Sequence, residues 1–265
     1  MTEQPFRVGQ SSPELHEQRV VDREAAFLLP YLKRGIRLLD CGCGPGTITL
    51  GLAEVVAPGE VVGVDVDPAR FAPAVASAAQ RGVSNVTFQQ GDIHALPFEG
   101  ESFDAVFVSA VLMHLLQPEL ALAELFRVLK RGGFLGARER HADADTFTNM
   151  TNEVWEVGQI RSRYLELQNT DLRFGRKLPS VVVQAGFDIR AMQLSPEASS
   201  AEARARAGDM LSRFLHQQDL VEVAAREGWG NQERLDQLAS AFKAWISDPA
   251  TQAETMHRGV VAVKP

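Results

Sequence analysis

A dense glycine loop at the end of an apolar stretch is the feature that most constrains the fold of this chain. Residues 38–46 read LLDCGCGPG, so Gly42, Gly44 and Gly46 follow two leucines and one acid, Asp40. Glycine is costly in backbone entropy, and this density indicates a backbone that turns sharply or lets another group approach closely. Between a strand and a helix, such a loop is typical of sheets that bind a ligand on backbone amides.

The residues around this loop alternate between strand-like and helix-like patterns. Such alternation implies right-handed β–α–β units and an α/β fold with a doubly wound sheet. The predicted strands are Ile36–Asp40, Val61–Val66, Val86–Gln90, Phe103–Ser109 and Phe134–Arg138, and the helices between them are Thr47–Ala57, Pro68–Arg81 and Pro118–Lys130.

The pattern changes after about residue 141, where long helical stretches interrupt the sheet. The helices are predicted at 146–168, 178–185, 201–228 and 232–246, the strands at 187–194 and 259–263, and one more helix from Ser12 towards Leu29. We therefore expect an N-terminal helix in residues 1–35 that covers the ligand site. We expect a sheet core of 36–141, 173–196 and 257–265, and helical cap insertions of 142–172 and 197–256. Open α/β sheets bind ligands at the carboxyl ends of their strands, where the first insertion leaves the core, so the cap is placed to cover the site.

The composition limits the compartment in which we expect the protein and the kinds of partner that it can bind. The net charge is −7, which disfavours a nucleic-acid partner. No apolar run is long enough to span a membrane, and the N-terminus lacks the apolar region of a secretory signal, so we expect a cytoplasmic protein. Cys41 and Cys43 are too close for an unstrained disulfide, and no Cys–His cluster completes a metal site, so we expect free thiols and no metal.

Acidic residues close the strands that follow the glycine loop. Asp65 ends the second predicted strand, where a carboxylate accepts hydrogen bonds from two ribose hydroxyls, whereas Asp67 suits a solvated turn. Asp92 and Ile93 end the third strand, where they suit an adenine amino group and ring face. A dinucleotide site would show G-x-G-x-x-G, but the spacing here is G-x-G-x-G with Thr47 in the last position. An NAD-dependent oxidoreductase therefore stays an alternative, with less support.

Taken together, these motifs resemble the class I S-adenosylmethionine-dependent methyltransferases. The resemblance covers residues 36–140 continuously, through LLDCGCGPG, VVGVDVD, GDIHALPFEGESFDAVFVS and ELFRVLKRGGFL. It implies a Rossmann-like, seven-stranded sheet with an edge hairpin near 187–194 and 257–263. It also implies S-adenosyl-L-methionine as the cofactor and S-adenosyl-L-homocysteine as the product.

The resemblance also implies roles for individual residues. Gly42, Gly44 and Gly46 would pass beneath the methionine moiety and the ribose, and Asp40 would face the ligand's amino group. Asp65, with Val66 beside it, would hold the ribose hydroxyls, and Asp92 and Ile93 the adenine. The backbone of Ser109, at the end of the fourth strand, would lie near the methionine carboxylate. Arg19 and Arg23 are further candidates for that carboxylate, although surface salt bridges are an equal interpretation.

The sequence gives a less specific signal for the residues that catalyse methyl transfer. Methyl transfer is an in-line displacement that needs alignment and exclusion of water, and a base only for a protonated acceptor. His114, after the fourth strand, is the candidate base or substrate contact, with a structural histidine as the alternative. Charged residues and a second histidine follow the fifth strand at Arg138, Glu139, Arg140, His141 and Asp143. The candidates for an apolar substrate pocket are Met113, Phe147, Trp155, Tyr164 and Trp245, which also suit a plain core.

Two observations indicate the class of methyl acceptor: a motif that the sequence lacks and the families that it resembles. The Asn/Asp-Pro-Pro-aromatic motif of amino-group methylation is absent after the fourth strand. The segment VLMHLLQPELALAELFRVLKRGG and the ARER stretch resemble methyltransferases of ubiquinone and menaquinone biosynthesis, relatives in secondary metabolism and gliotoxin dithiol methyltransferases. We expect an enzyme that methylates O, S, N or C of a partly apolar small molecule, as a monomer or homodimer. A non-catalytic S-adenosylmethionine-binding module stays an alternative.

Overall fold

The computed structural model describes residues 21–196 and 201–265, which form two compact units. The sheet unit contains the residues up to Arg140, Arg173–Ser195 and His257–Pro265, and the helical unit contains His141–Leu172 and Pro196–Met256. The predictions for Ser12 and Arg19 lie outside the described residues, but the helix predicted to run towards Leu29 ends at Glu24. Among the described helices, none is both long and apolar enough to cross a membrane.

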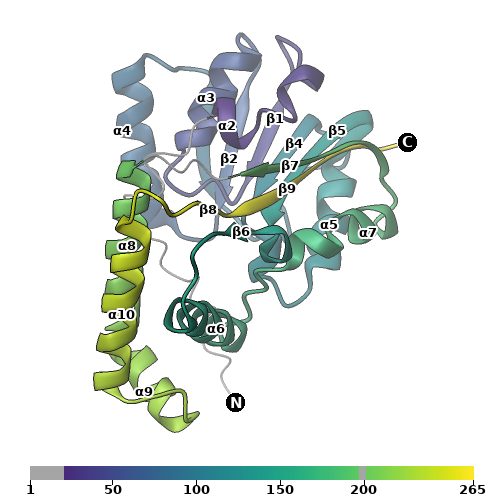
Figure 1. The fold of residues 1–265 in the computed structure, drawn as a ribbon. Helices are drawn as coiled ribbons and strands as arrows, with labels where there is room; N and C mark the ends of the chain where they lie inside the picture. The colour runs from purple at the N-terminus through teal and green to yellow at the C-terminus, as the bar shows by residue number, and fades with distance from the viewer. Residues whose placement is uncertain (1–20, 197–200) are drawn as a thin grey trace, which may run out of the picture. The chain divides into compact units, whose positions relative to one another are not determined.

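A single seven-stranded sheet organises the first unit (Figure 1). Its strands, in spatial order, are β3 (Val86–Gln90), β2 (Val61–Asp65), β1 (Leu38–Cys41), β4 (Phe103–Ser109), β5 (Leu129–Arg140), β9 (Met256–Val263) and β7 (Asp188–Pro196). The first five are parallel, and β9 runs antiparallel to β5. The prediction of a doubly wound sheet with a C-terminal edge hairpin is confirmed. The order reverses at β1, so the carboxyl ends of β1 and β4 meet where such sheets bind ligands.

Helices cover both faces of this sheet because the crossovers are right-handed. They are α2 (Val21–Glu24), α3 (Thr47–Val56), α4 (Phe71–Arg81), α5 (Pro118–Val128) and α7 (Phe174–Gln184), with the short 3-10 helices η1 (Leu29–Tyr31), η2 (Pro68–Arg70) and η3 (Leu112–His114). The core on one face joins Leu28, Leu52 and Val56 to the buried strand residues Leu38 and Phe107. Burial on both faces explains why the central strands are almost wholly apolar.

The fifth strand begins earlier than the sequence predicts. The sequence predicts a helix through Lys130, but α5 ends at Val128 and β5 starts at Leu129. Leu129 pairs with Phe103 of β4 across a register shift. Further along β5, the backbone N–H of Gly132 donates to the carbonyl of Lys264, and the N–H of Lys264 donates to the carbonyl of Gly133. These bonds join segments far apart in sequence, so no local pattern indicates them.

In its described residues, the helical unit contains four α-helices and a two-stranded sheet. Its elements are β6 (Thr146–Phe147), α6 (Asn152–Leu167), α8 (Ala201–Leu215), α9 (Gln218–Arg226), α10 (Gln232–Ser247) and β8 (Ala253–Glu254), with the 3-10 helix η4 (Ala142–Ala144) before them. The predicted apolar face of α10 is buried at Leu235 and Leu238, where it joins Ile160 of α6 in one core.

Two of the predicted helices in this unit differ in extent. The helix expected from Thr146 starts at Asn152, because Thr146 and Phe147 pair with residues 253–254 and the Thr151 hydroxyl accepts the N–H of Val154 at 3.3 Å. The stretch 201–228 forms two helices, α8 and α9, rather than one. Capping by Thr151 and pairing with a distant two-residue strand therefore override the helical periodicity before Asn152.

Candidate functional site

The glycine loop leaves the carboxyl end of β1 in a backbone conformation that other residues rarely adopt. Gly42, Gly44 and Gly46 have φ angles of 75°, 53° and 76°. A Cβ atom at Gly42 would lie 2.2 Å from the Cγ2 of Val111, and one at Gly46 would lie 2.8 Å from the ring of Phe88. The left-handed backbone favours glycine at all three positions. At Gly42 and Gly46 there is also no room for a Cβ atom.

Asp65, at the end of β2, is tied directly to this loop. One carboxylate oxygen accepts the N–H of Gly44 at 2.8 Å, and the other accepts the N–H of Asp67 at 3.0 Å. An ionised carboxylate has about four acceptor positions, so Asp65 keeps capacity for further donors such as hydroxyls. The adjacent Val66 has an exposed fraction of 48%.

Asp40, the last acid before the loop, is buried in the sheet unit. Its carboxylate accepts the hydroxyl of Thr49, on the first turn of α3, at 2.6 Å. Sequence reasoning missed Thr49, although a hydroxyl on the buried side of a helix start is the available signal. Burial, and then Asp40 and Asp65, raise the pKa of the Cys41 and Cys43 thiols, so both stay protonated and unreactive.

The residues after β3 form a short polar turn beside β2. Partial burial opposes ionisation of Asp92, but hydrogen bonds from the backbone and ring of His94 outweigh it and hold the Asp92 pKa below its ordinary value. Ile93 is buried, and the N–H of Gly91 donates to the carbonyl of Asp65 at 3.1 Å. The ends of β2 and β3 are thereby held together.

A tight turn follows β4 and carries the candidate base. Ser109 is buried, and Ala110 has a left-handed φ of 56°. The next residues form η3, which contains the buried Met113 and ends at His114. Desolvation lowers the pKa of His114 from 6.5 to about 4, so this imidazole is neutral near pH 7. A neutral imidazole can accept a proton, although a pKa near 4 makes it a weak base at pH 7.

Buried charged residues lie at the end of β5, at the carboxyl edge of the sheet. Arg138 forms an ion pair of 2.6 Å with Glu24 of α2, and both side chains are 2% exposed. Glu139 is fully buried, and its carboxylate accepts the N–H groups of Val111, Leu112 and Met113. The sequence pointed to the charged residues after β5, but not to Glu24 as a partner.

The remaining substrate candidates belong to the helical unit. His141 is buried, and its Nδ1 has no hydrogen-bond partner among the described residues. Trp155 is 57% exposed on α6. Tyr164 lies in the core of the unit, where its ring packs edge-on against Phe214 at 5.4 Å.

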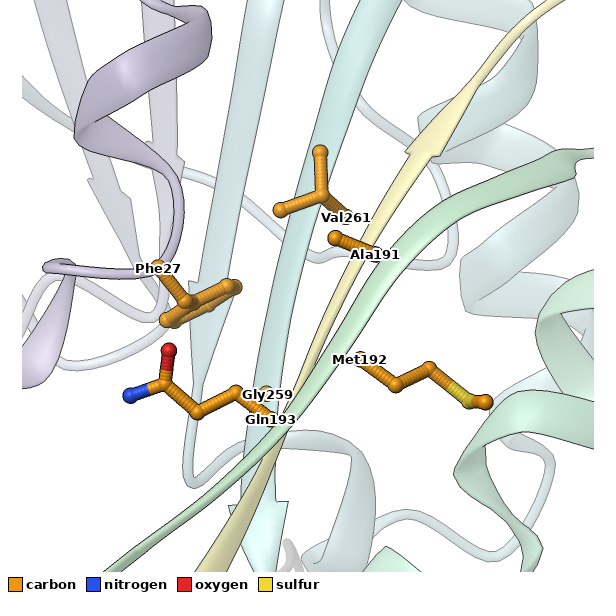
Figure 2. Close-up of a pocket in the computed structure, with 6 residues that line it drawn as sticks. All are labelled: Phe27, Ala191, Met192, Gln193, Gly259 and Val261. Carbon is orange, nitrogen blue, oxygen red and sulfur yellow. The ribbon is translucent and has the colours of Figure 1, made fainter.

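A small cavity of about 70 Å³ lies elsewhere in the sheet unit (Figure 2). Its lining comes from the edge strand β7, its neighbour β9 and the segment before η1, and consists of Phe27, Ala191, Met192, Gln193, Gly259 and Val261. None of these residues is a predicted site residue. Apart from Arg19, which lies outside the described residues, the predicted cofactor residues instead gather at the carboxyl ends of β1 to β4.

Comparison with known proteins decides what this arrangement is. A sequence profile described as a methyltransferase domain matches residues 32–189. The chain belongs to this methyltransferase family. A Schizosaccharomyces pombe protein named as an uncharacterized methyltransferase is 39% identical over 89% of this chain and 87% of its own length. A probable methyltransferase of Aspergillus luteorubrus is 28% identical over 98% and 97%.

Solved structures share the fold of this methyltransferase. The YcgJ protein of Bacillus subtilis matches with a TM-score of 0.58 at 19% identity, over 91% of this chain and 97% of its own. Phosphoethanolamine N-methyltransferase 2 of Haemonchus contortus, solved with S-adenosyl-L-methionine, matches with a TM-score of 0.53 at 19% identity, over 91% of this chain and 52% of its own. At these identities the likeness shows the fold alone.

The methyltransferase uses S-adenosylmethionine as its cofactor. The residues at the strand ends fit this molecule, because Asp65 retains acceptor capacity beside a loop of left-handed glycines. Because the chain belongs to a methyltransferase family, the alternative of an NAD-dependent oxidoreductase is rejected. Thr47, which stands where a dinucleotide-binding motif has its last glycine, already argued against it.

Proposed function

We propose that this methyltransferase moves the methyl group to an oxygen, sulfur, nitrogen or carbon atom of a partly apolar small molecule. The observation that carries the proposal is His114, a desolvated and neutral imidazole on the turn after β4. That turn packs Val111 against Gly42, so the turn that carries the candidate base contacts the loop assigned to the cofactor.

The cofactor residues proposed here follow the strand ends in order. Their roles are an amino-group contact for Asp40, close backbone approach for Gly42, Gly44 and Gly46, ribose binding for Asp65 and Val66, adenine binding for Asp92 and Ile93, and a carboxylate contact for Ser109 and Arg19. Two carboxylates at the ends of neighbouring strands suit this assignment because they are acceptors and the ribose and adenine present donors.

When bound, the cofactor supplies an electrophilic methyl group on a sulfonium. The chain's own contribution is to align the acceptor in line with that group and to exclude water. For an acceptor hydroxyl or thiol, His114 would take the proton that the acceptor loses on methylation. An acceptor that arrives unprotonated needs no base.

The acceptor would be held by the helical unit acting as a cap, with Met113, His141, Trp155 and Tyr164 as substrate contacts. A demethylmenaquinone methyltransferase of Lactococcus lactis is 40% identical over 37% of this chain and 40% of its own length, which supports an apolar acceptor. The net charge of −7 supports a small molecule over a nucleic acid. We place the enzyme in the cytoplasm, as a monomer or homodimer.

Calorimetric titration with S-adenosylhomocysteine, S-adenosylmethionine and NAD tests the cofactor residues. We expect micromolar binding of the first two ligands to the wild type and loss of that binding in Asp65→Ala. Asp67→Ala is the matched control, because this acid caps η2 through the N–H of Ala69 and is assigned no ligand. Binding of NAD alone, or equal affinities of the two variants, would overturn these roles.

A screen of phenols, thiols and amines with a methyl-labelled donor tests the acceptor class. With an O–H or S–H acceptor, His114→Asn should lower kcat by roughly 100- to 10,000-fold, as loss of a general base does, and leave cofactor affinity unchanged. His216→Asn, an exposed histidine paired with Asp236 in the helical unit, is the control. Full activity of His114→Asn would remove the proposed base.

A further inference from the structure

The carboxylate of Glu139 holds three successive backbone N–H groups. One oxygen accepts from Val111 at 3.1 Å and from Leu112 at 2.9 Å, and the other accepts from Met113 at 3.4 Å. Glu139 is fully buried at the end of β5, and the turn it binds follows β4, the neighbouring strand. Charge-assisted bonds of this kind are about twice as strong as neutral ones, so they offset the cost of burying the carboxylate.

The turn needs such a partner because its backbone is not favourable by itself. Ala110 adopts a left-handed φ of 56°, a conformation that costs a residue with a Cβ atom. The N–H groups that follow open the 3-10 helix η3 and have no acceptor within that helix. Without Glu139, the polar groups of a largely buried turn would lack these bonds.

The turn also connects two parts of the proposed site. At one end, Val111 lies so close to Gly42 that any Cβ there would meet its Cγ2 at 2.2 Å. At the other end lies His114, the proposed base. A shift of the turn would therefore change the position of His114 relative to the glycine loop.

We propose that Glu139 is the positioning residue that fixes the turn 111–114, and with it the geometry between the cofactor loop and His114. This inference rests on the proposed function. Glu139 is not itself the base, because its oxygens are directed at backbone amides and it is fully buried. Its effect on methyl transfer passes through the turn.

Two conservative variants test the role. Glu139→Gln removes the charge and places an amide donor where an acceptor is needed, and Glu139→Asp keeps the charge but shortens the side chain. Asp104→Asn is the matched control, because Asp104 also accepts a backbone N–H, that of Arg37 at 2.9 Å, but at the opposite end of β4.

The readout that needs no substrate is the titration of His114, followed by NMR. In the wild type, His114 should titrate near pH 4, and in both Glu139 variants its pKa should rise towards 6.5 as the loosened turn admits water. Asp104→Asn should leave it unchanged. A folded Glu139→Gln whose His114 titrates as in the wild type overturns the proposal. If both variants fail to fold, rapid amide exchange at 111–113 in the wild type overturns it, and protected amides support it.

Turnover separates a positioning role from a purely structural one. With an acceptor identified, kcat of the Glu139 variants should fall by roughly 10- to 100-fold well below their melting temperature, because small misplacements are costly. Binding of S-adenosylhomocysteine should weaken only a few-fold, because Asp65 keeps its own contacts. A lowered melting temperature with unchanged kcat overturns the proposal. Absence of S-adenosylhomocysteine binding in the wild type refutes the cofactor assignment instead, and the His114 titration still reports on the turn.

Discussion

Replacing Gly42 by alanine separates the two reasons for a glycine at this position. The backbone at Gly42 has a φ of 75°, which costs an alanine about 1–2 kcal/mol. The new Cβ would also lie 2.2 Å from the Cγ2 of Val111. Overpacking of a buried contact adds about 1–3 kcal/mol, so the variant should lose about 2–5 kcal/mol in free energy of unfolding.

Gly82 provides the matched control for this substitution. It has a similar φ of 69°, but a Cβ there would meet no atom within 4 Å. Gly82→Ala should therefore lose only about 1–2 kcal/mol, the conformational cost. In the double variant Gly42→Ala/Val111→Ala the obstructing methyl group is gone, so the second substitution should recover part of the loss.

Urea unfolding followed by circular dichroism measures these differences. Wild type, Gly42→Ala, Gly82→Ala, Val111→Ala and the double variant should share one m-value, so that differences in midpoint report stability. Equal losses for Gly42→Ala and Gly82→Ala would show that Val111 does not restrict the loop. Additive losses in the double variant would refute the contact in the same way.

The remaining predictions concern buried charge, pH and the thiols. Glu24→Gln should destabilise the protein by about 3–5 kcal/mol in urea unfolding, because Arg138 is left as a buried charge, whereas Glu54→Gln, which breaks the exposed pair with Arg81, should cost at most about 1 kcal/mol. Because the His114 pKa is lowered from 6.5 to about 4, the unfolded chain binds the proton more tightly than the folded protein. The neutral imidazole therefore contributes at most about 3 kcal/mol to the free energy of unfolding above pH 6.5, and this contribution is lost as the pH falls towards 4. His114→Asn should flatten that dependence in unfolding curves measured from pH 7 to 4. Cys41 and Cys43 should resist a thiol reagent until the protein is denatured, because both are buried; reaction in the native state would contradict their placement.

The parts of this methyltransferase that could be predicted from the sequence are those that local pattern determines. The glycine loop, the apolar strands and Asp65 at the end of β2 follow from residue type and spacing within a few positions. The assignment of Asp92 and Ile93 to adenine stays a prediction, as does the cap role of the helical unit. The early start of β5 at Leu129 depends on pairing with Phe103 of β4 across a register shift, which no local pattern reveals.

The sequence did not indicate the partners of Arg138 and Glu139, because those partners also lie far away along the chain. The geometry of the strand nevertheless explains why each of the two side chains needs a partner. Neighbouring residues of a strand point to opposite faces of the sheet. Arg138 pairs with Glu24 of α2, which packs with α3, while Glu139 binds the turn of η3, which packs near α5 and α7. One strand end thus fixes the segments that cover both faces at the carboxyl edge. The motif ARER is the only trace of this in the sequence, because a charged pair at the end of a buried strand must find partners on both sides.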